Sequence, residues 1–209
     1  MSTTVSRYTA ALALLTHPHS PKRRSGAKML RKLKDPAAGP ALLVALQHEL
    51  QDPRTWETQY QMIMALAETD YRPVLPYLEA LVHHQFEATM IYTALGDAIV
   101  RLGHSSTDDV APALRLLTTD NQMLIAGALR AIAMLHLTPS QAEVEQLIDY
   151  VLNHSPHHGA DFWIAAAAPG WSGKRVEQFL AQAALSQDDN TRRAAIAAQQ
   201  KHYLKWNPA

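Results

Sequence analysis

Histidines and carboxylates are the side chains in this sequence with the most direct chemical use. Seven of the eleven histidines form the three tightest groups: His17 with His19, His83 with His84, and His154 with His157, His158 and Asp161. On a helix, His157 and Asp161 would share a face, where they could bind a divalent metal or act as general acid and base. A zinc site needs three or four convergent ligands, and the neighbouring segments offer no matching pattern. We therefore expect loop and cap histidines, with no metal and no cofactor.

The stretch DPRTWETQYQM, residues 52–62, resembles the lining of a pocket. However, its apolar residues continue in one helical stripe at intervals of four, seven and eleven residues, which is typical of a buried face: Trp56, Tyr60, Ile63 and Ala67. The sequence predicts that Trp56 is mostly core. The polar residues on the other side of this helix are then expected to face solvent: Arg54, Glu57, Gln61 and Glu68.

A basic cluster lies at residues 22–34, and Arg24, Lys28 and Arg31 fall on one helical face there. Three interpretations stay open: a solvated face, a phosphate contact, or docking against the acidic part of a partner. Charge is segregated along the chain. Residues 1–34 sum to +8, residues 35–161 to −11 and residues 162–209 to +3. Such asymmetry steers association, so the acidic middle should repel nucleic acid and attract a basic protein.

Composition narrows the function classes further. The chain has 209 residues, 47% of them hydrophobic, which is enough for one substantial domain or a run of repeats. It has no cysteine, so disulfides, thiolate metal sites and a cysteine nucleophile are excluded, and the cytoplasm is the expected location. Its eight glycines form no phosphate-binding loop. The apolar run at residues 10–15 is too short for a membrane span, so we expect no membrane association.

An apolar quartet at spacing 0, +3, +4, +7 recurs every 32 to 36 residues. Each quartet marks the second helix of a helical pair, because the interval is the length of two helices and two turns. The quartets begin at Gly39, Val74, Val110, Val144 and Val176. Ser20-Pro21 and Asp52-Pro53 are predicted as an N-cap and a first helical residue, and Thr138 with Gln141 as a capping box.

These features predict an all-α fold of about five helical pairs with an extra helix at each end. The whole chain, 1–209, is then a single domain. Its predicted repeats cover residues 19–51, 52–85, 86–119, 120–154 and 155–187, and its capping helices cover residues 4–16 and 189–204.

The turns of these pairs resemble those of the HEAT-repeat family. The likeness is carried by DDNTRRAA at residues 188–195 and by the turns at Asp35-Pro36 and Asp52-Pro53, and it covers roughly residues 19–204. The fifth repeat departs from the pattern at Pro169 and Gly170, and the third lacks an initial proline. The resemblance implies a right-handed α-solenoid of HEAT-like pairs whose second helices line a concave face, in a family made up mostly of binding scaffolds.

Positions +1, +5 and +9 after the start of each quartet point away from the core stripe. On second helices they should face the concave surface, where mixed polar groups suit recognition of one protein. The predicted partner-binding residues are Glu79, His83, Arg115, Glu145, Asp149, Asn153 and Glu177, with Trp171 of the PGWSG loop as an aromatic anchor.

We therefore expect a non-enzymatic protein-binding module that is monomeric when unbound and binds a basic partner. The sharper form of this hypothesis is an immunity or antitoxin protein that neutralises a nuclease-type toxin. Two alternatives stay open: a HEAT-like DNA glycosylase or other HEAT-like enzyme acting on nucleic acid or a chromophore, and a structural subunit of a larger assembly.

Overall fold

The computed structural model describes residues 2–119, 121–154 and 159–205 of the chain, and all regular structure in them is helical. The all-α prediction is confirmed for this part of the chain. The chain divides into two compact units, Met1–Gly103 and His104–Ala209, each with its own core. The boundary falls inside the predicted third repeat, 86–119, so its two helices belong to different units.

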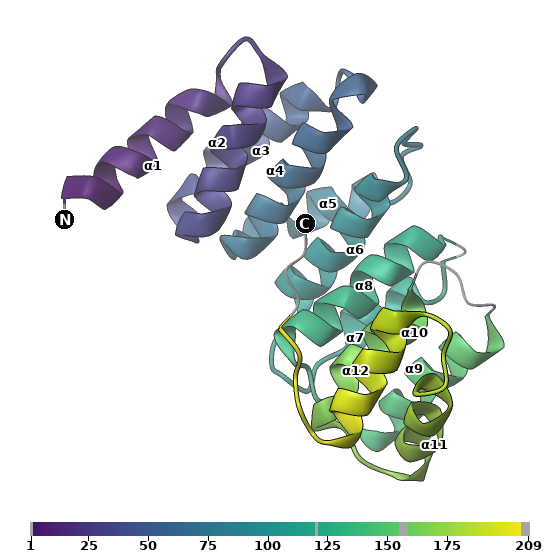
Figure 1. The fold of residues 1–209 in the computed structure, drawn as a ribbon. Coiled ribbons are helices and arrows are strands. Elements are labelled where there is room, and N and C mark those ends of the chain that lie inside the picture. The colour runs from purple at the N-terminus through teal and green to yellow at the C-terminus, as the bar shows by residue number, and fades with distance from the viewer. Residues whose placement is uncertain (1, 120, 155–158, 206–209) are drawn as a thin grey trace. The chain divides into compact units, whose positions relative to one another are not determined.

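Unit 1 contains six α-helices arranged in two layers (Figure 1). Their bounds are α1 Ser2–Leu15, α2 Ser20–Leu33, α3 Gly39–Glu49, α4 Trp56–Glu68, α5 Leu75–Leu81 and α6 Met90–Gly103. Helices α1, α2, α4 and α6 pack side by side in chain order, α3 packs against α4 and α1, and α5 packs against α6. Three short 3-10 helices lead into α-helices of this unit: η1 Pro36–Ala38 precedes α3, η2 Pro53–Thr55 precedes α4 and η3 Arg72–Val74 precedes α5.

Unit 2 has the same kind of packing. Its helices are α7 Ala111–Leu116, α8 Gln122–Leu135, α9 Gln141–Asn153, α10 Ala160–Ala167, the 3-10 helix η4 Ala168–Gly170, α11 Lys174–Ala183 and α12 Asp189–Gln199. Helices α8, α10 and α12 pack consecutively, while α9 and α11 pack against each other and against this row.

The predicted quartets supply much of the core. All four members are buried in the two quartets that begin at Val144 and Val176. Three members of the quartet that begins at Gly39 are buried, and two members of each quartet on the short helices α5 and α7, which begin at Val74 and Val110. The 3.6-residue period therefore predicted the inward face of the second helices well.

Helix α4 departs from the prediction. All residues from 58 to 67 are buried except the half-buried Tyr60, and the buried ones include Gln61, because α4 lies between α2 and α6 and against α3. Trp56, predicted as core, is 36% exposed at the start of this helix. The stripe argument assumed one packed face, whereas a helix enclosed on several sides buries its middle and exposes its ends.

The helix starts also differ from the prediction in register. His19, not Ser20, is the N-cap residue of α2, and the Ser20 hydroxyl donates to Glu49 instead, at 2.5 Å. Asp52 does act as a cap, but its carboxylate accepts from the Arg54 N–H at the start of η2. The capping box of α9 is formed by Ser140 and Glu143, not by Thr138 and Gln141.

Candidate functional site

The predicted face in unit 1 consists of Glu79 on α5 and His83 just after it. Both side chains are exposed and lie one helical turn apart. In unit 2, the predicted residues lie on three second helices: Arg115 on α7, Glu145, Asp149 and Asn153 on α9, and Glu177 on α11. All of them are exposed except Asp149, which is half-buried. The outward direction of these positions is therefore as the spacing predicted.

Asp149 and Arg175 form an ion pair that crosses from α9 to α11. The Arg175 Nε lies 3.0 Å from Asp149 Oδ1, and the second guanidinium nitrogen bonds the same oxygen. The negative charge of Asp149 is therefore largely compensated. Beside it, the Gln141 side-chain amide donates to Glu145 at 2.9 Å. Glu145 and Glu177 are the exposed carboxylates among the predicted residues on this pair of helices.

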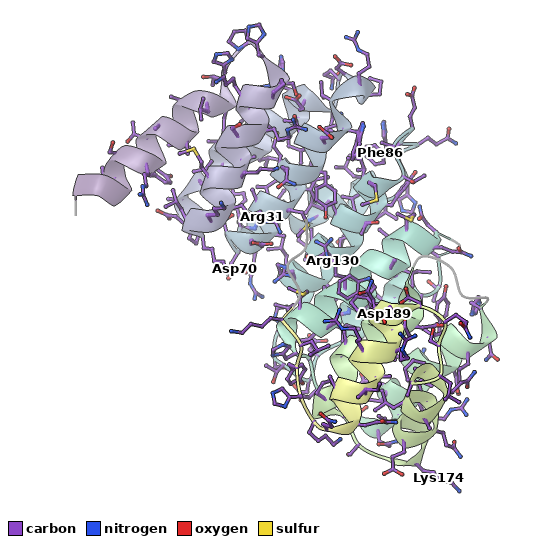
Figure 2. The ribbon with its side chains drawn as sticks, viewed as in Figure 1. Arg31, Asp70, Phe86, Arg130, Lys174 and Asp189 are labelled. Carbon is purple, nitrogen blue, oxygen red and sulfur yellow. The ribbon has the colours of Figure 1, made fainter. Side chains whose placement is uncertain are left out.

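Cationic side chains lie on the same helices. Lys174 is exposed at the first residue of α11, where Figure 2 labels it. Together with Arg175 it gives this face a mixed polar character. The arrangement suits a surface that distinguishes one partner by the position of its charges.

Trp171 does not belong to this face. Its side chain is 2% exposed, and its indole N–H donates to the carbonyl of Leu137 at 2.9 Å. The following loop is held from the other side, where the Lys201 ammonium donates to the Trp171 carbonyl at 2.5 Å. An aromatic anchor has to be accessible to a partner, so the prediction for Trp171 is wrong: it is a core residue of unit 2.

The histidine groups bring no ligand set together. His157 and His158 lie outside the described residues, and within the described ranges no three histidine or carboxylate side chains converge as a metal would require. His154 stacks on Tyr150, with ring centroids 4.1 Å apart. Burial raises the pKa of Asp161 at the start of α10.

The basic cluster at residues 22–34 is used largely inside unit 1. Arg31 of α2, labelled in Figure 2, donates from Nε and Nη2 to Glu68 of α4 at 2.9 and 2.6 Å. Arg24 of α2 pairs with Glu57, which also lies on α4. Arg24 and Arg31 were expected, with Lys28, on a solvated, phosphate-contacting or partner-docking face, but both pair with carboxylates of α4. The exposed cations of the cluster are the lysines: Lys22, Lys28, Lys32 and Lys34.

Unit 1 also has a groove that the sequence reasoning missed. It has a volume of about 720 Å³ and lies where α1 meets α3. Its lining is mostly apolar: Leu12, Leu15, Thr16, His17, Pro18, Arg23, Pro40, Ala41, Val44, Ala45 and His48. One signal for it was present in the sequence. The stretch PALLVAL, residues 40–46, is apolar all round, and such a helix is usually covered on more than one side.

A smaller pocket of about 200 Å³ lies beside Trp56 and is closed by the loop between α5 and α6. Phe86 of that loop, labelled in Figure 2, packs edge-on against Tyr92 with ring centroids 5.4 Å apart. The Tyr92 hydroxyl in turn donates to the carbonyl of His84 at 2.8 Å. These contacts fix the loop, and the ionisable residues in the pocket lining are His84 and Glu87.

Neither the protein-family models nor the curated proteins with which the chain was compared match it. Within the described ranges, a helix with the length and apolar character that a bilayer crossing needs is absent.

Proposed function

We propose that this protein is a non-enzymatic scaffold of HEAT-like helical pairs that binds a partner protein through the outward polar side chains of its second helices. The proposed architecture is a right-handed α-solenoid with these helices on its concave face. The observation that carries the proposal is the surface formed by α9 and α11. These helices pack against each other and present Glu145, Asp149 and Glu177 on neighbouring turns.

The partner that fits this surface best carries positive charge. Glu145 and Glu177 are exposed, and Asp149 of α9 pairs with Arg175 of α11 between them. Exposed charges of this kind speed association more than they stabilise the complex, and salt weakens their effect. In its sharper form, the proposal is an immunity or antitoxin protein that covers a basic, nuclease-type toxin in the cytoplasm.

Affinity capture from the native cell tests the proposal. The captured partner should associate with the Glu177→Lys variant up to about tenfold more slowly than with the unchanged protein, because one favourable charge becomes unfavourable. A higher salt concentration should reduce the difference in association rate between the variant and the unchanged protein. Glu87→Lys is the matched control, because Glu87 is exposed in the loop between α5 and α6 and does not belong to the proposed face.

Two results would contradict the proposal. A partner that binds Glu177→Lys and the unchanged protein at the same rate would place the contact elsewhere. Capture of nucleic acid in place of a protein would favour the alternative of a HEAT-like enzyme that acts on nucleic acid.

A further inference from the structure

The groove between α1 and α3 has the dimensions of a binding site. Its volume of about 720 Å³ lies within the range of about 300–1,000 Å³ that ligand sites usually occupy. The residues that α3 contributes are at positions 40, 41, 44, 45 and 48, which is one stripe along the helix. At 1.5 Å per residue this stripe is about 12 Å long, or a little over two helical turns. The groove is therefore elongated along α3.

The apolar wall of the groove is accessible. Val44 is 66% exposed, and Pro40 and Ala41 beside it are exposed as well. On the α1 side of the groove, Leu12 is half-buried and Leu15 is buried, so the accessible part of this wall is Leu12. Helix α3 belongs to the second layer of unit 1 and packs on α4 and α1, so a helix laid in the groove would lie beside α3 in that layer.

The polar end of the groove offers hydrogen-bond donors. The Nδ1 atom of His17 accepts from the backbone N–H of His19 at 3.0 Å. In the neutral imidazole this leaves the Nε2–H of His17 as a donor. His48, in the last turn of α3, also lines the groove. The loop between α1 and α2 is held by Arg23, whose Nη1 donates to the carbonyls of His17 and Pro18 at 2.8 Å each.

No carboxylate competes for these donors in the groove lining. Residues 1–34 contain no Asp or Glu. Glu49, the acidic residue of α3, is 1% exposed and is bound by Arg23. Asp35 precedes η1, where its carboxylate accepts from the Ala37 N–H, and it does not line the groove. The chemical complement of this end is therefore a hydrogen-bond acceptor, and a carboxylate is a favourable one because hydrogen bonds to an ionised group are about twice as strong as those between neutral groups.

We propose that this groove binds an amphipathic helix of a partner protein, whose apolar side chains contact Leu12, Ala41 and Val44 and whose carboxylate meets His17 and His48. A second copy of α1 fits less well, since α1 has no carboxylate and its charged side chain, Arg7, is a cation. The inference rests on the proposed role in protein binding, but it concerns a surface separate from Glu145 and Glu177.

The test uses synthetic helical peptides, because the partner is not needed for it. A stapled peptide of about 14 residues carries leucines on one face and glutamates beside them, since unconstrained helices of this length are marginal in water. A matched peptide carries lysines in place of the glutamates. We expect the glutamate peptide to bind at least about tenfold more tightly than the lysine peptide, measured by fluorescence polarisation.

Three variants locate the binding. Val44→Glu should weaken binding of the glutamate peptide by about tenfold or more, since the substitution places a charge in the apolar wall. His48→Glu should reverse the preference, so that the lysine peptide binds more tightly. Leu185→Glu is the matched control, because Leu185 is 82% exposed in unit 2 and should leave both peptides unaffected.

Several outcomes would overturn the inference. Equal binding of the two peptides, or unchanged binding to Val44→Glu, would mean that the groove does not recognise an acidic helix. Self-association in sedimentation velocity that Val44→Glu abolishes would make a second copy the occupant. Binding of decanoate in the groove, with neither peptide bound, would make it a site for a small amphiphile.

The peptide result stands apart from the proposed function. If neither peptide binds but the Glu177→Lys substitution still slows association of the native partner, the groove inference is contradicted and the proposed function is not. If the glutamate peptide binds but the Glu177→Lys substitution leaves the association rate of the native partner unchanged, the proposed second-helix face is contradicted and the groove inference is not.

Discussion

Arg23 of α2 and Glu49 of α3 form a buried ion pair with two hydrogen bonds. The Arg23 Nε lies 2.5 Å from Glu49 Oε2, and Nη2 lies 3.0 Å from Oε1. Ser20 donates to the same carboxylate, and its hydroxyl lies 2.7 Å from that of Thr58 on α4. Three helices thus meet at one carboxylate that has no exposed surface.

Removing this charge should destabilise unit 1. We expect Glu49→Gln to lower the free energy of unfolding by about 3–5 kcal/mol, because the Arg23 guanidinium then stays half-buried without its counter-ion. Urea denaturation followed by circular dichroism measures the loss, and hydrogen exchange should place it in α2 and α4. Glu57→Gln is the control. Its pair with Arg24 is largely exposed, so a loss of about 1 kcal/mol or less is expected. Equal losses would contradict the structural role of Glu49.

The same carboxylate should make stability depend on pH. Burial by itself raises the pKa of Glu49, but hydrogen bonds from Arg23, Ser20 and Thr55 and the Arg23 charge lower this pKa below its ordinary value. A lowered folded-state pKa stabilises the fold above the unfolded pKa of about 4.3. That stability is lost as the pH falls through the folded-state pKa. The difference between the unchanged protein and Glu49→Gln should therefore be constant near neutral pH and shrink in acid. A difference that grows in acid would contradict this assignment.

Gly39 at the start of α3 is required by its contact with Tyr71. A Cβ atom on Gly39 would overlap the Tyr71 ring, although the backbone φ of −53° suits any residue. Gly39→Ala should cost about 1–3 kcal/mol of stability through overpacking. In the Tyr71→Ala background the same change should cost much less, as a double-mutant cycle of thermal or urea unfolding would measure. If Gly39→Ala costs the same stability in the Tyr71→Ala background, the backbone at Gly39, and not its contact with Tyr71, would explain the loss.

Trp171 should affect stability and not partner recognition. Trp171→Phe removes the N–H that bonds the Leu137 carbonyl, and a buried carbonyl without its donor costs about 1–3 kcal/mol. The thermal unfolding temperature should fall, while binding of the captured partner, measured well below that temperature, should be unchanged. A variant of ordinary stability that binds the partner tenfold more weakly would return Trp171 to the recognition surface.

Charge segregation along the sequence has a different meaning in the folded chain. The excess of +8 over residues 1–34 and of −11 over residues 35–161 suggested a basic segment and an acidic face. Arg23, Arg24 and Arg31 of α2 instead pair with carboxylates of α3 and α4. Part of the asymmetry is therefore internal to unit 1, and the steering field is weaker than the sums suggest.

The sequence by itself determined the helices and their inward faces. An apolar side chain at +3, +4 and +7 from another lies on the same side of a helix whatever that helix packs against, so Val144, Leu147 and Ile148 were placed correctly in the core. Tertiary structure alone decided which side chains meet across helices: that Glu49 neutralises Arg23, that Trp171 is buried, and that Val44 faces a groove. Those outcomes depend on which helices are neighbours and how far each extends past the next, and a period of 3.6 residues within one helix carries no information about either.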